Sequence, residues 1–271
     1  MIIVLQNDHH RKDALTLKIG FFDSGIGGLT VLRLARRKLP DADFLYYADV
    51  DNVPYGEKTG DEVRALTLSA ARFLTDLGAE AVVLACNTAT SAAAAPLREV
   101  LSVPVVGMEP AVKKALDEHP HGRVLVAATP FTCRGDKLRR LIDQVGGEEL
   151  VDMLPLPGLV HLAERCDFSP EAVDPYLRGE LRRFDLARYD SVVLGCTHFL
   201  YFTDAFRRLL PAAVRLVDGN DGTVNQLLRV VGPCTGGGSV TFFDSGRPAS
   251  PESLKKTRRL LERLDELEST E

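Results

Sequence analysis

Val82-Val83-Leu84-Ala85-Cys86 is an apolar run that ends in a cysteine, and the polar pair Asn87-Thr88 follows it. The same pattern returns as Val192-Val193-Leu194-Gly195-Cys196 before Thr197-His198. Short apolar runs of this kind are typical of buried parallel strands, and each copy follows a predicted amphipathic helix. The repeat therefore predicts two related α/β halves, each with a cysteine at the carboxyl end of a strand. In open α/β sheets, ligands bind at that end of the strands.

Strands and helices are expected to alternate along the rest of the chain. Apolar runs indicate strands at residues 17–22, 44–48, 81–85, 103–106, 123–128, 191–194, 214–217 and 240–243. Amphipathic patterns indicate helices at residues 29–39, 61–77, from 88 onward, and at 135–145, 170–184, 203–210 and 251–268. This alternation predicts an α/β fold with mainly parallel sheets. We expect two pseudo-symmetric α/β domains with the functional site in the cleft between them.

The composition argues against several classes of protein. The 271 residues carry a formal net charge of −5 and no long basic run, so a nucleic-acid partner is not expected. No apolar stretch reaches the roughly 20 residues that cross a membrane, so no membrane partner is expected either. Residues 1–16 begin apolar and then turn polar, which is the reverse of a signal peptide. We therefore expect an N-terminal extension on a cytoplasmic protein.

The cysteines are the candidate reactive groups. There are five, an odd number, and no two form a Cys-x-x-Cys pair, which argues against a disulfide framework and a four-cysteine zinc site. Cys86 and Cys196 each precede a polar turn and a helix, whose N-terminal amides favour a thiolate. We interpret this matched pair as reactive thiols, with packing in the core as the alternative.

Two matched thiols suit one task better than others. A disulfide exchanger usually keeps its cysteines close in sequence, a metal site needs further ligands, and a thiol hydrolase needs one cysteine with a histidine. Two bases on opposite faces of a substrate can remove a proton from a chiral carbon and return one to the other side. Such a reaction needs one thiol ionised and the other protonated, so each requires a neighbour that tunes it.

Four side chains are candidate tuning partners. Asp23 ends the first strand, and His198 lies two residues after Cys196 and titrates near neutral pH. A turn residue or helix cap is the alternative for Asp23, and a satisfied polar residue the alternative for His198. His161 and Glu164 lie one helical turn apart, and for both we favour a solvated helix surface.

A glycine loop follows the first strand. Gly25-Ile26-Gly27-Gly28 is close to a dinucleotide fingerprint, but Thr30 stands where that pattern needs its third glycine. A loop that receives a small anion, such as a carboxylate, at a helix N-terminus fits the sequence better.

Together these residues resemble glutamate racemases of the aspartate/glutamate racemase superfamily. The matching segments are Phe22-Asp23-Ser24-Gly25-Ile26-Gly27-Gly28-Leu29, Val53-Pro54-Tyr55-Gly56-Glu57-Lys58, Ala85-Cys86-Asn87-Thr88-Ala89 and Gly195-Cys196-Thr197-His198. Weaker similarity occurs at residues 129–132 and 243–246. The set keeps the family's order from about residue 19 to 246, and that order makes it specific.

The resemblance implies roles for the site residues. Cys86 and Cys196 would be the paired acid/base thiols, tuned by Asp23 and His198. The substrate would be glutamate, the product D-glutamate for peptidoglycan, and neither a metal nor pyridoxal phosphate would be needed. The pocket would be lined by groups that hydrogen-bond carboxylates and an ammonium group, namely Ser24, Pro54, Tyr55, Gly56, Asn87, Thr88, Thr129, Thr132 and Thr197.

The family's architecture also implies a domain division. The last segment would return to the first domain, so residues 17–112 and 221–271 would form one domain and residues 113–220 the other. A homodimer is a candidate assembly.

The sequence departs from the family at three places. Gly135 and Leu138 stand where a serine and a tyrosine are common, and Leu200 stands where a proline is usual. His161 occupies the place of a glutamate that follows a Leu-Val pair, and we do not carry that role over to Glu164. These places are expected near the pocket, which keeps a binding protein without turnover open as an alternative. An aspartate racemase, and a thiol hydrolase or lyase that uses Cys196 and His198, also stay open.

Overall fold

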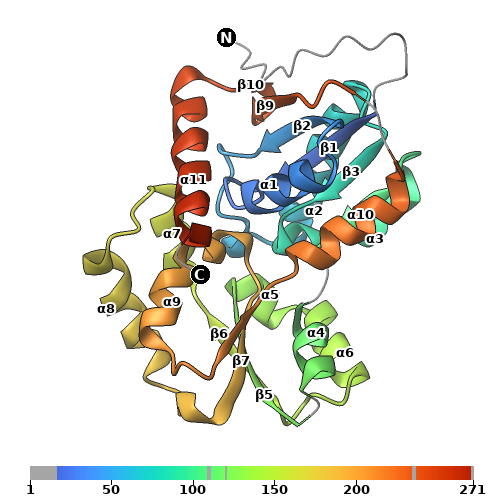
Figure 1. The fold of residues 1–271 in the computed structure, drawn as a ribbon. Coiled ribbons are helices and arrows are strands. Elements are labelled where there is room, and N and C mark those ends of the chain that lie inside the picture. The colour runs from blue at the N-terminus through green and yellow to red at the C-terminus, as the bar shows by residue number, and fades with distance from the viewer. Residues whose placement is uncertain (1–16, 109–110, 120, 234–235, 270–271) are drawn as a thin grey trace.

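The computed structural model describes residues 17–108, 111–119, 121–233 and 236–269. Within these residues the strands form two sheets, one of six strands in the order β10-β9-β2-β1-β3-β4 and one of four in the order β6-β5-β7-β8 (Figure 1). The N-terminal extension predicted at residues 1–16 lies outside the described residues.

The strands are short and apolar, as buried parallel strands usually are. The first sheet contains β1 (Lys18–Asp23), β2 (Asp43–Ala48), β3 (Ala81–Leu84), β4 (Val105–Gly107), β9 (Val240–Asp244) and β10 (Arg247–Pro248). The second contains β5 (Arg123–Ala128), β6 (Val151–Pro155), β7 (Tyr189–Leu194) and β8 (Arg215–Val217).

The two sheets share one strand order. In the first sheet β2, β1, β3 and β4 lie side by side, and in the second β6, β5, β7 and β8 do so, all in parallel. The antiparallel pair among the described residues is β9 with β10, at the edge of the first sheet. The order makes β1 equivalent to β5 and β3 equivalent to β7, which confirms the predicted pseudo-symmetric α/β fold.

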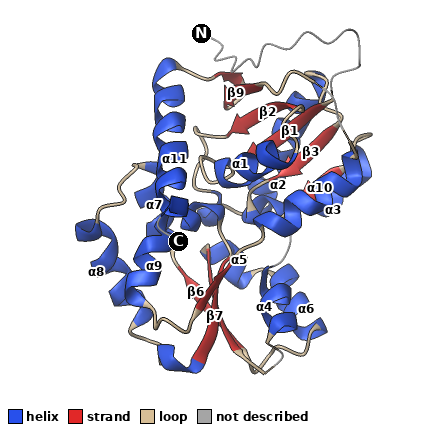
Figure 2. Ribbon diagram, in the orientation of Figure 1, coloured by secondary structure: helices blue, strands red, loops and turns tan. Residues whose placement is uncertain are grey.

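Helices cover the sheets (Figure 2). Around the first sheet lie α1 (Leu29–Lys38), α2 (Gly60–Asp76), α3 (Asn87–Val100), α10 (Asn220–Val231) and α11 (Pro251–Ser269). Around the second lie α4 (Ala111–Glu118), α5 (Pro130–Arg134), α6 (Asp136–Gln144), α7 (Pro157–Glu164), α8 (Pro170–Leu181) and α9 (Thr203–Leu209). Short 3₁₀ turns occur at η1 (Tyr55–Glu57), η2 (Leu186–Arg188) and η3 (Thr197–Phe202).

Both faces of the first sheet are buried. Successive residues of a strand point to opposite faces, so Phe21 packs with Leu29 of α1 while Phe22 packs with Leu74 of α2. All four side chains have 0% of their surface exposed. This double burial explains why the central strands are apolar without alternation.

Several elements were not anticipated from the sequence, among them the short helix α5 and the short strand β10. The strand β6 and the helices α4 and α10 fall in segments to which we assigned no regular structure. Residues 111–118 and 220–231 become helical because their apolar side chains pack against other elements of the fold. Helix α4 packs against strands β5, β7 and β8, and helix α10 packs against helix α1 and strand β4.

The chain passes from the first sheet to the second between β4 and α4, and it returns between β8 and α10. The predicted boundaries, after residues 112 and 220, lie within a few residues of these crossings. The division into 17–112 with 221–271 and 113–220 remains a proposal. No helix of the described residues is both long and apolar enough to span a membrane.

A matched pair of truncations tests the core of the first sheet. Leu74→Ala should lower the free energy of unfolding by about 2–5 kcal/mol, because it opens a cavity against β1. Leu77, just beyond α2, is 39% exposed, and Leu77→Ala should change stability by no more than about 0.5 kcal/mol. Urea unfolding measures both, and equal losses would contradict this packing.

Candidate active site

Strands β3 and β7 each lead to one of the two thiols, and both thiols line the same cavity. Cys86 and Cys196 follow β3 and β7 at the same distance, and each is buried with 6% of its surface exposed. The residues before them, Ala85 and Gly195, donate backbone N–H bonds to the neighbouring central strand at 2.8 and 2.7 Å. The equivalent register in both sheets therefore sets the two thiols at equivalent strand ends that face each other across the cleft.

Both thiols line one small cavity. Its volume is about 10 Å³, which is about the room that a single water molecule needs. The cavity is too small for an amino acid, so the structure represents a closed form of the cleft. It is lined by Ser24, Pro54, Tyr55, Gly56, Cys86, Asn87, Thr88, Thr129, Val160, Cys196, Thr197 and His198.

Cys86 is held as a neutral thiol. Its Sγ lies 3.5 Å from the Ser24 hydroxyl and accepts a bond from the Ala89 amide of α3 at 3.4 Å. These contacts favour the thiolate of Cys86, as expected at a helix N-terminus, but burial and the charge of Asp23 outweigh them. Burial first, and then the charge of Asp23, raise the pKa of Cys86 to about 12. The helix amides therefore do not make this thiol acidic, contrary to the expectation from sequence.

Cys196 has a different partner. Its Sγ lies 3.8 Å from Nδ1 of His198, at the start of η3. Burial tends to lower the pKa of His198, but its bonds to Cys196 and Glu164 outweigh burial and raise that pKa well above the usual value. The raised pKa therefore places a cation, the His198 imidazolium, directly beside Cys196 Sγ.

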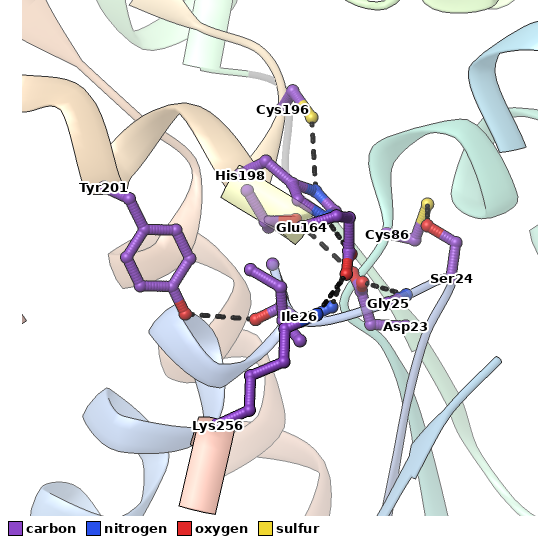
Figure 3. Close-up of polar contacts among 12 residues, drawn as sticks. Asp23, Ser24, Gly25, Ile26, Cys86, Glu164, Cys196, His198, Tyr201 and Lys256 are labelled. Atoms are coloured by element: carbon purple, nitrogen blue, oxygen red, sulfur yellow. Dashed lines mark hydrogen bonds and ion pairs between the residues drawn. The ribbon is translucent and has the colours of Figure 1, made fainter. Parts of the chain in front are cut away.

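Glu164 completes this side of the site (Figure 3). Its Oε1 lies 2.8 Å from Nε2 of His198 and accepts the Ile26 amide at 3.1 Å, while Oε2 accepts the Lys256 ammonium at 2.9 Å. Burial tends to raise its pKa, but His198 and Lys256 lower it to about 2. The solvated surface that we favoured for Glu164 is wrong, since it is a largely buried, charged partner of the histidine.

The same contact revises the interpretation of the glycine loop. The loop does receive a carboxylate, but the carboxylate on the Ile26 amide belongs to Glu164 of the chain itself. A Cβ on residue 25 would lie 2.0 Å from Glu164 Oε1, so only glycine admits this approach. The hydroxyls of Tyr46 and Tyr201 donate to the carbonyls of Gly25 and Ile26 at 3.1 Å each and hold the loop in place.

Asp23 lies beneath the cavity with no exposed surface. It accepts the Gly25 amide at 2.8 Å and the Thr197 hydroxyl at 3.3 Å. Burial raises its pKa, and the charge of His198 opposes that rise. Asp23 thus links the first strand to the turn that carries Cys196, and its charge acts on Cys86.

The remaining predicted pocket residues form two groups. Thr129 lies 3.0 Å from the Thr88 hydroxyl and donates to Thr132 at 3.1 Å, so the three hydroxyls form a chain across the cleft. The Tyr55 hydroxyl donates to Asp49 at 2.6 Å, and Ser245 donates to the same carboxylate at 2.8 Å. Of the predicted set, Asp23 and Thr132 are absent from the cavity lining and support it from behind.

The four residues at which the sequence departs from the family do not line this cavity. His161 is half exposed and pairs with Glu57 at 2.8 Å, which agrees with the surface position that we favoured for it. Leu138 lines a separate cavity of about 580 Å³ that contains neither thiol. Leu200 packs against the edge of the core, and Gly135 joins α5 to α6. None of the four is among the residues that line the small cavity.

Several residues of the site were not found from the sequence. Val160 lines the cavity, and Asp49, Ser245 and Lys256 hold other site residues. Ser245 carried a weak signal, because it lies in the segment 243–246 that resembles the family. The signal for Glu164 was its spacing from His161, but spacing alone does not tell which residue of the turn faces inward.

Comparison with known proteins agrees with this geometry. Residues 30–227 match the family described as Asp/Glu/Hydantoin racemase. A glutamate racemase from Campylobacter curvus is 54% identical over 78% of this chain and 82% of its own length, and one from Campylobacter concisus is 48% identical over 93% and 98%. The chain belongs to the Asp/Glu/Hydantoin racemase family.

A solved structure within this racemase family shows the same fold. The glutamate racemase from Thermus thermophilus, in complex with β-chloro-D-alanine, is 34% identical, with a TM-score of 0.71 over 92% of this chain and 93% of its own. The racemase fold thus extends over nearly the whole chain.

Two glycines offer a matched test of how tightly the racemase cleft is packed. A Cβ on residue 27 would lie 2.4 Å from Thr197 Oγ1 and 2.6 Å from His198 Nδ1, so Gly27→Ala should destabilise the protein by about 1–3 kcal/mol. Gly179 in α8 has nothing within 4 Å of the same position, so Gly179→Ala should be neutral or stabilise by about 0.5–1 kcal/mol. Thermal unfolding separates the two, and a Gly27→Ala protein as stable as the wild type would count against the closed contact.

The Glu164–His198 pair predicts a pH dependence of stability. Glu164 has its pKa lowered from 4.5 to about 2, so its contribution is present above pH 4.5 and is lost as the pH falls toward 2. His198 has its pKa raised above 6.5, so its contribution is present below pH 6.5 and is lost as the pH rises through the raised pKa.

Glu164→Gln should therefore cost about 1–3 kcal/mol of unfolding free energy near pH 6, and clearly less near pH 3. Urea unfolding at the two pH values measures the difference, with the exposed Glu262→Gln as control. A cost that stays constant from pH 6 to pH 3 would disprove the charged pair.

Proposed function

We propose that this protein is a glutamate racemase that interconverts L- and D-glutamate with two thiols and no cofactor. The observation that carries the proposal is the placement of Cys86 and Cys196 at equivalent strand ends on one cavity. The curated relatives that are 44–54% identical to this chain carry the name glutamate racemase. Their names favour glutamate over aspartate as the substrate.

The two thiols have different charged neighbours. In the closed form Cys86 is neutral, because burial and Asp23 disfavour its thiolate. Cys196 Sγ lies 3.8 Å from His198, whose raised pKa makes it a cation. This difference supports Cys196 as the base and Cys86 as the acid that a two-base reaction requires.

The proposed reaction moves one proton on each face of the substrate. The Cys196 thiolate removes the α-proton and becomes a neutral thiol, and the electron pair stays on the α-carbon, delocalised into the substrate carboxylate. The Cys86 thiol then donates its proton to the opposite face and becomes a thiolate. The reverse direction starts from the Cys86 thiolate, so the thiols exchange roles while His198 stabilises negative charge at Cys196.

The pocket residues suit the polar groups of an amino acid. Asn87, Thr88, Thr129 and Thr197 offer hydroxyl and amide groups on the cavity wall. Such groups donate to carboxylates and accept from an ammonium group. We propose that they hold the two carboxylates and the amino group of glutamate, together with Ser24, Pro54, Tyr55, Gly56 and the supporting Thr132.

The wider setting is also a proposal. Reduced thiols persist in a reducing compartment, which supports the cytoplasm as the location. D-glutamate is the product that peptidoglycan synthesis requires, and the family resemblance supports that use. The proposal includes a homodimer as a candidate assembly, and no nucleic-acid partner.

Single cysteine substitutions test the two-thiol proposal. Cys86→Ser and Cys196→Ser should each lower turnover of L- and D-glutamate by about 10²- to 10⁴-fold, the range for loss of a general acid or base. Cys133→Ser should keep its activity, because this half-buried cysteine in α5 lies off the cavity. Chiral chromatography of both enantiomers, with no cofactor added, measures the rates.

The alternatives predict other results. A thiol hydrolase that uses Cys196 and His198 would tolerate Cys86→Ser. An aspartate racemase would act on aspartate instead of glutamate, and a binding protein would be stabilised by glutamate without converting it. Any of these outcomes from folded protein would overturn the proposal.

A further inference from the structure

The C-terminal helix α11 is joined to the first domain by both apolar and charged contacts. Its residues Leu260, Leu264 and Leu267 lie in the core that also contains α1. On the same side, Arg33 and Arg37 of α1 pair with Glu268 at 2.6 and 2.5 Å, and Arg33 also pairs with Asp265. The helix is therefore fixed to α1.

The other flank of the same leucine stripe, away from Asp265 and Glu268, contacts the second half of the molecule. Arg263 pairs with Asp204 of α9 at 2.7 Å and donates to the Tyr201 carbonyl at 3.3 Å. Lys256, two turns earlier on the same side, pairs with Glu164 of α7 at 2.9 Å. Figure 1 shows α11 lying along the first sheet's domain and extending down to α7 and α9. The helix thus bridges the two domains with its charged side chains.

The contacts of Lys256 reach the active site through one residue. Glu164 binds Lys256 with Oε2 while its Oε1 holds His198 and the Ile26 amide. Ile26 and Lys256 belong to elements of the first domain, and Glu164 and His198 to elements of the second. Two bonds of the Glu164 carboxylate therefore cross the cleft, and the third holds the histidine of Cys196.

The closed cavity makes these bonds important for access. A cavity of about 10 Å³ does not admit an amino acid, so the domains must separate before substrate enters. Separation would part Glu164 from Ile26 and Lys256, because those two residues stay with the first domain. Closure would restore both bonds and return the carboxylate to its place on His198.

We propose that α11 is a strap that holds the cleft closed, and that Lys256 is a positioning residue that acts on His198 and Cys196 through Glu164. The proposal rests on the proposed racemase function only for the identity of the substrate. Lys256 touches neither thiol, and its part is to favour the closed form in which Glu164 is ordered. The opposing view is a surface ion pair with no measurable effect, which is common for exposed pairs.

Alkylation of the thiols tests the strap without any need for turnover. Cys86 is buried at 6% exposure and lines the cavity of the closed cleft, so its reaction with iodoacetamide reports opening. In Lys256→Met, Cys86 should react about three- to tenfold faster, since the closed form loses one partly buried ion pair. Mass spectrometry follows Cys86 and, in the same sample, the half-buried Cys133 of α5, which packs against the core of the second sheet and does not line the cavity.

Two control variants sharpen the result. Lys255→Met removes the exposed neighbouring lysine and should leave the Cys86 rate unchanged. Lys256→Arg keeps a cation that can reach Glu164 and should restore most of the protection. In turnover, Lys256→Met should raise KM or lower kcat for glutamate, whereas Lys255→Met should not.

The possible outcomes separate the hypotheses. Faster alkylation of Cys86 without acceleration at Cys133, reversed in Lys256→Arg, supports the strap. An unchanged Cys86 rate in Lys256→Met overturns it, and so does an equal acceleration at Cys133, which would indicate general loosening. A protein that shows selective opening but no racemisation would retain the strap while refuting the proposed function.

Discussion

The position of one largely buried carboxylate organises much of the active site. Glu164 accepts the Ile26 amide, holds the His198 ring and pairs with Lys256, so one side chain joins the glycine loop, the second thiol and the C-terminal helix. A charged group in the interior needs such partners, because desolvation otherwise neutralises it. The close approach at Gly25 follows from the same requirement. The loop is shaped for the protein's own anion, and the substrate meets a site that is already charged.

The two sheets on either side of this carboxylate repeat the same strand order, but the charged side chains beside the two thiols differ. The strand order β2-β1-β3-β4 is repeated as β6-β5-β7-β8, and each copy ends in a cysteine that faces the cleft. Asp23 and burial keep Cys86 neutral, while His198 provides a cation beside Cys196. The shared backbone explains why the thiols are placed alike, and their different neighbours are what the proposed acid and base roles rest on.

The sequence predicted those parts of the molecule that local patterns determine. Apolar runs located the strands β1, β3 and β7, which lead to Asp23, Cys86 and Cys196, and the repeat predicted the pseudo-symmetry. The helix α10 was missed because its apolar stripe is recognisable only against α1. The environment of Glu164 was misjudged because its one-turn spacing from His161 does not show which of the two residues faces inward. The pKa of Cys86 was misjudged because burial and a charge from another strand outweigh the helix amides.

The central claim is that two thiols act on opposite faces of one substrate, and isotope transfer tests it most directly. L-glutamate is incubated with the protein in D₂O, and the first few per cent of D-glutamate and the remaining L-glutamate are analysed by mass spectrometry. The two-thiol reaction predicts one α-deuterium in nearly all of the D-glutamate and none in the remaining L-glutamate, because the donating thiol exchanges with solvent before it reacts. D-glutamate that retains the original α-proton would indicate a single base that returns the same proton, and would contradict the assignment of Cys86 and Cys196 as a pair.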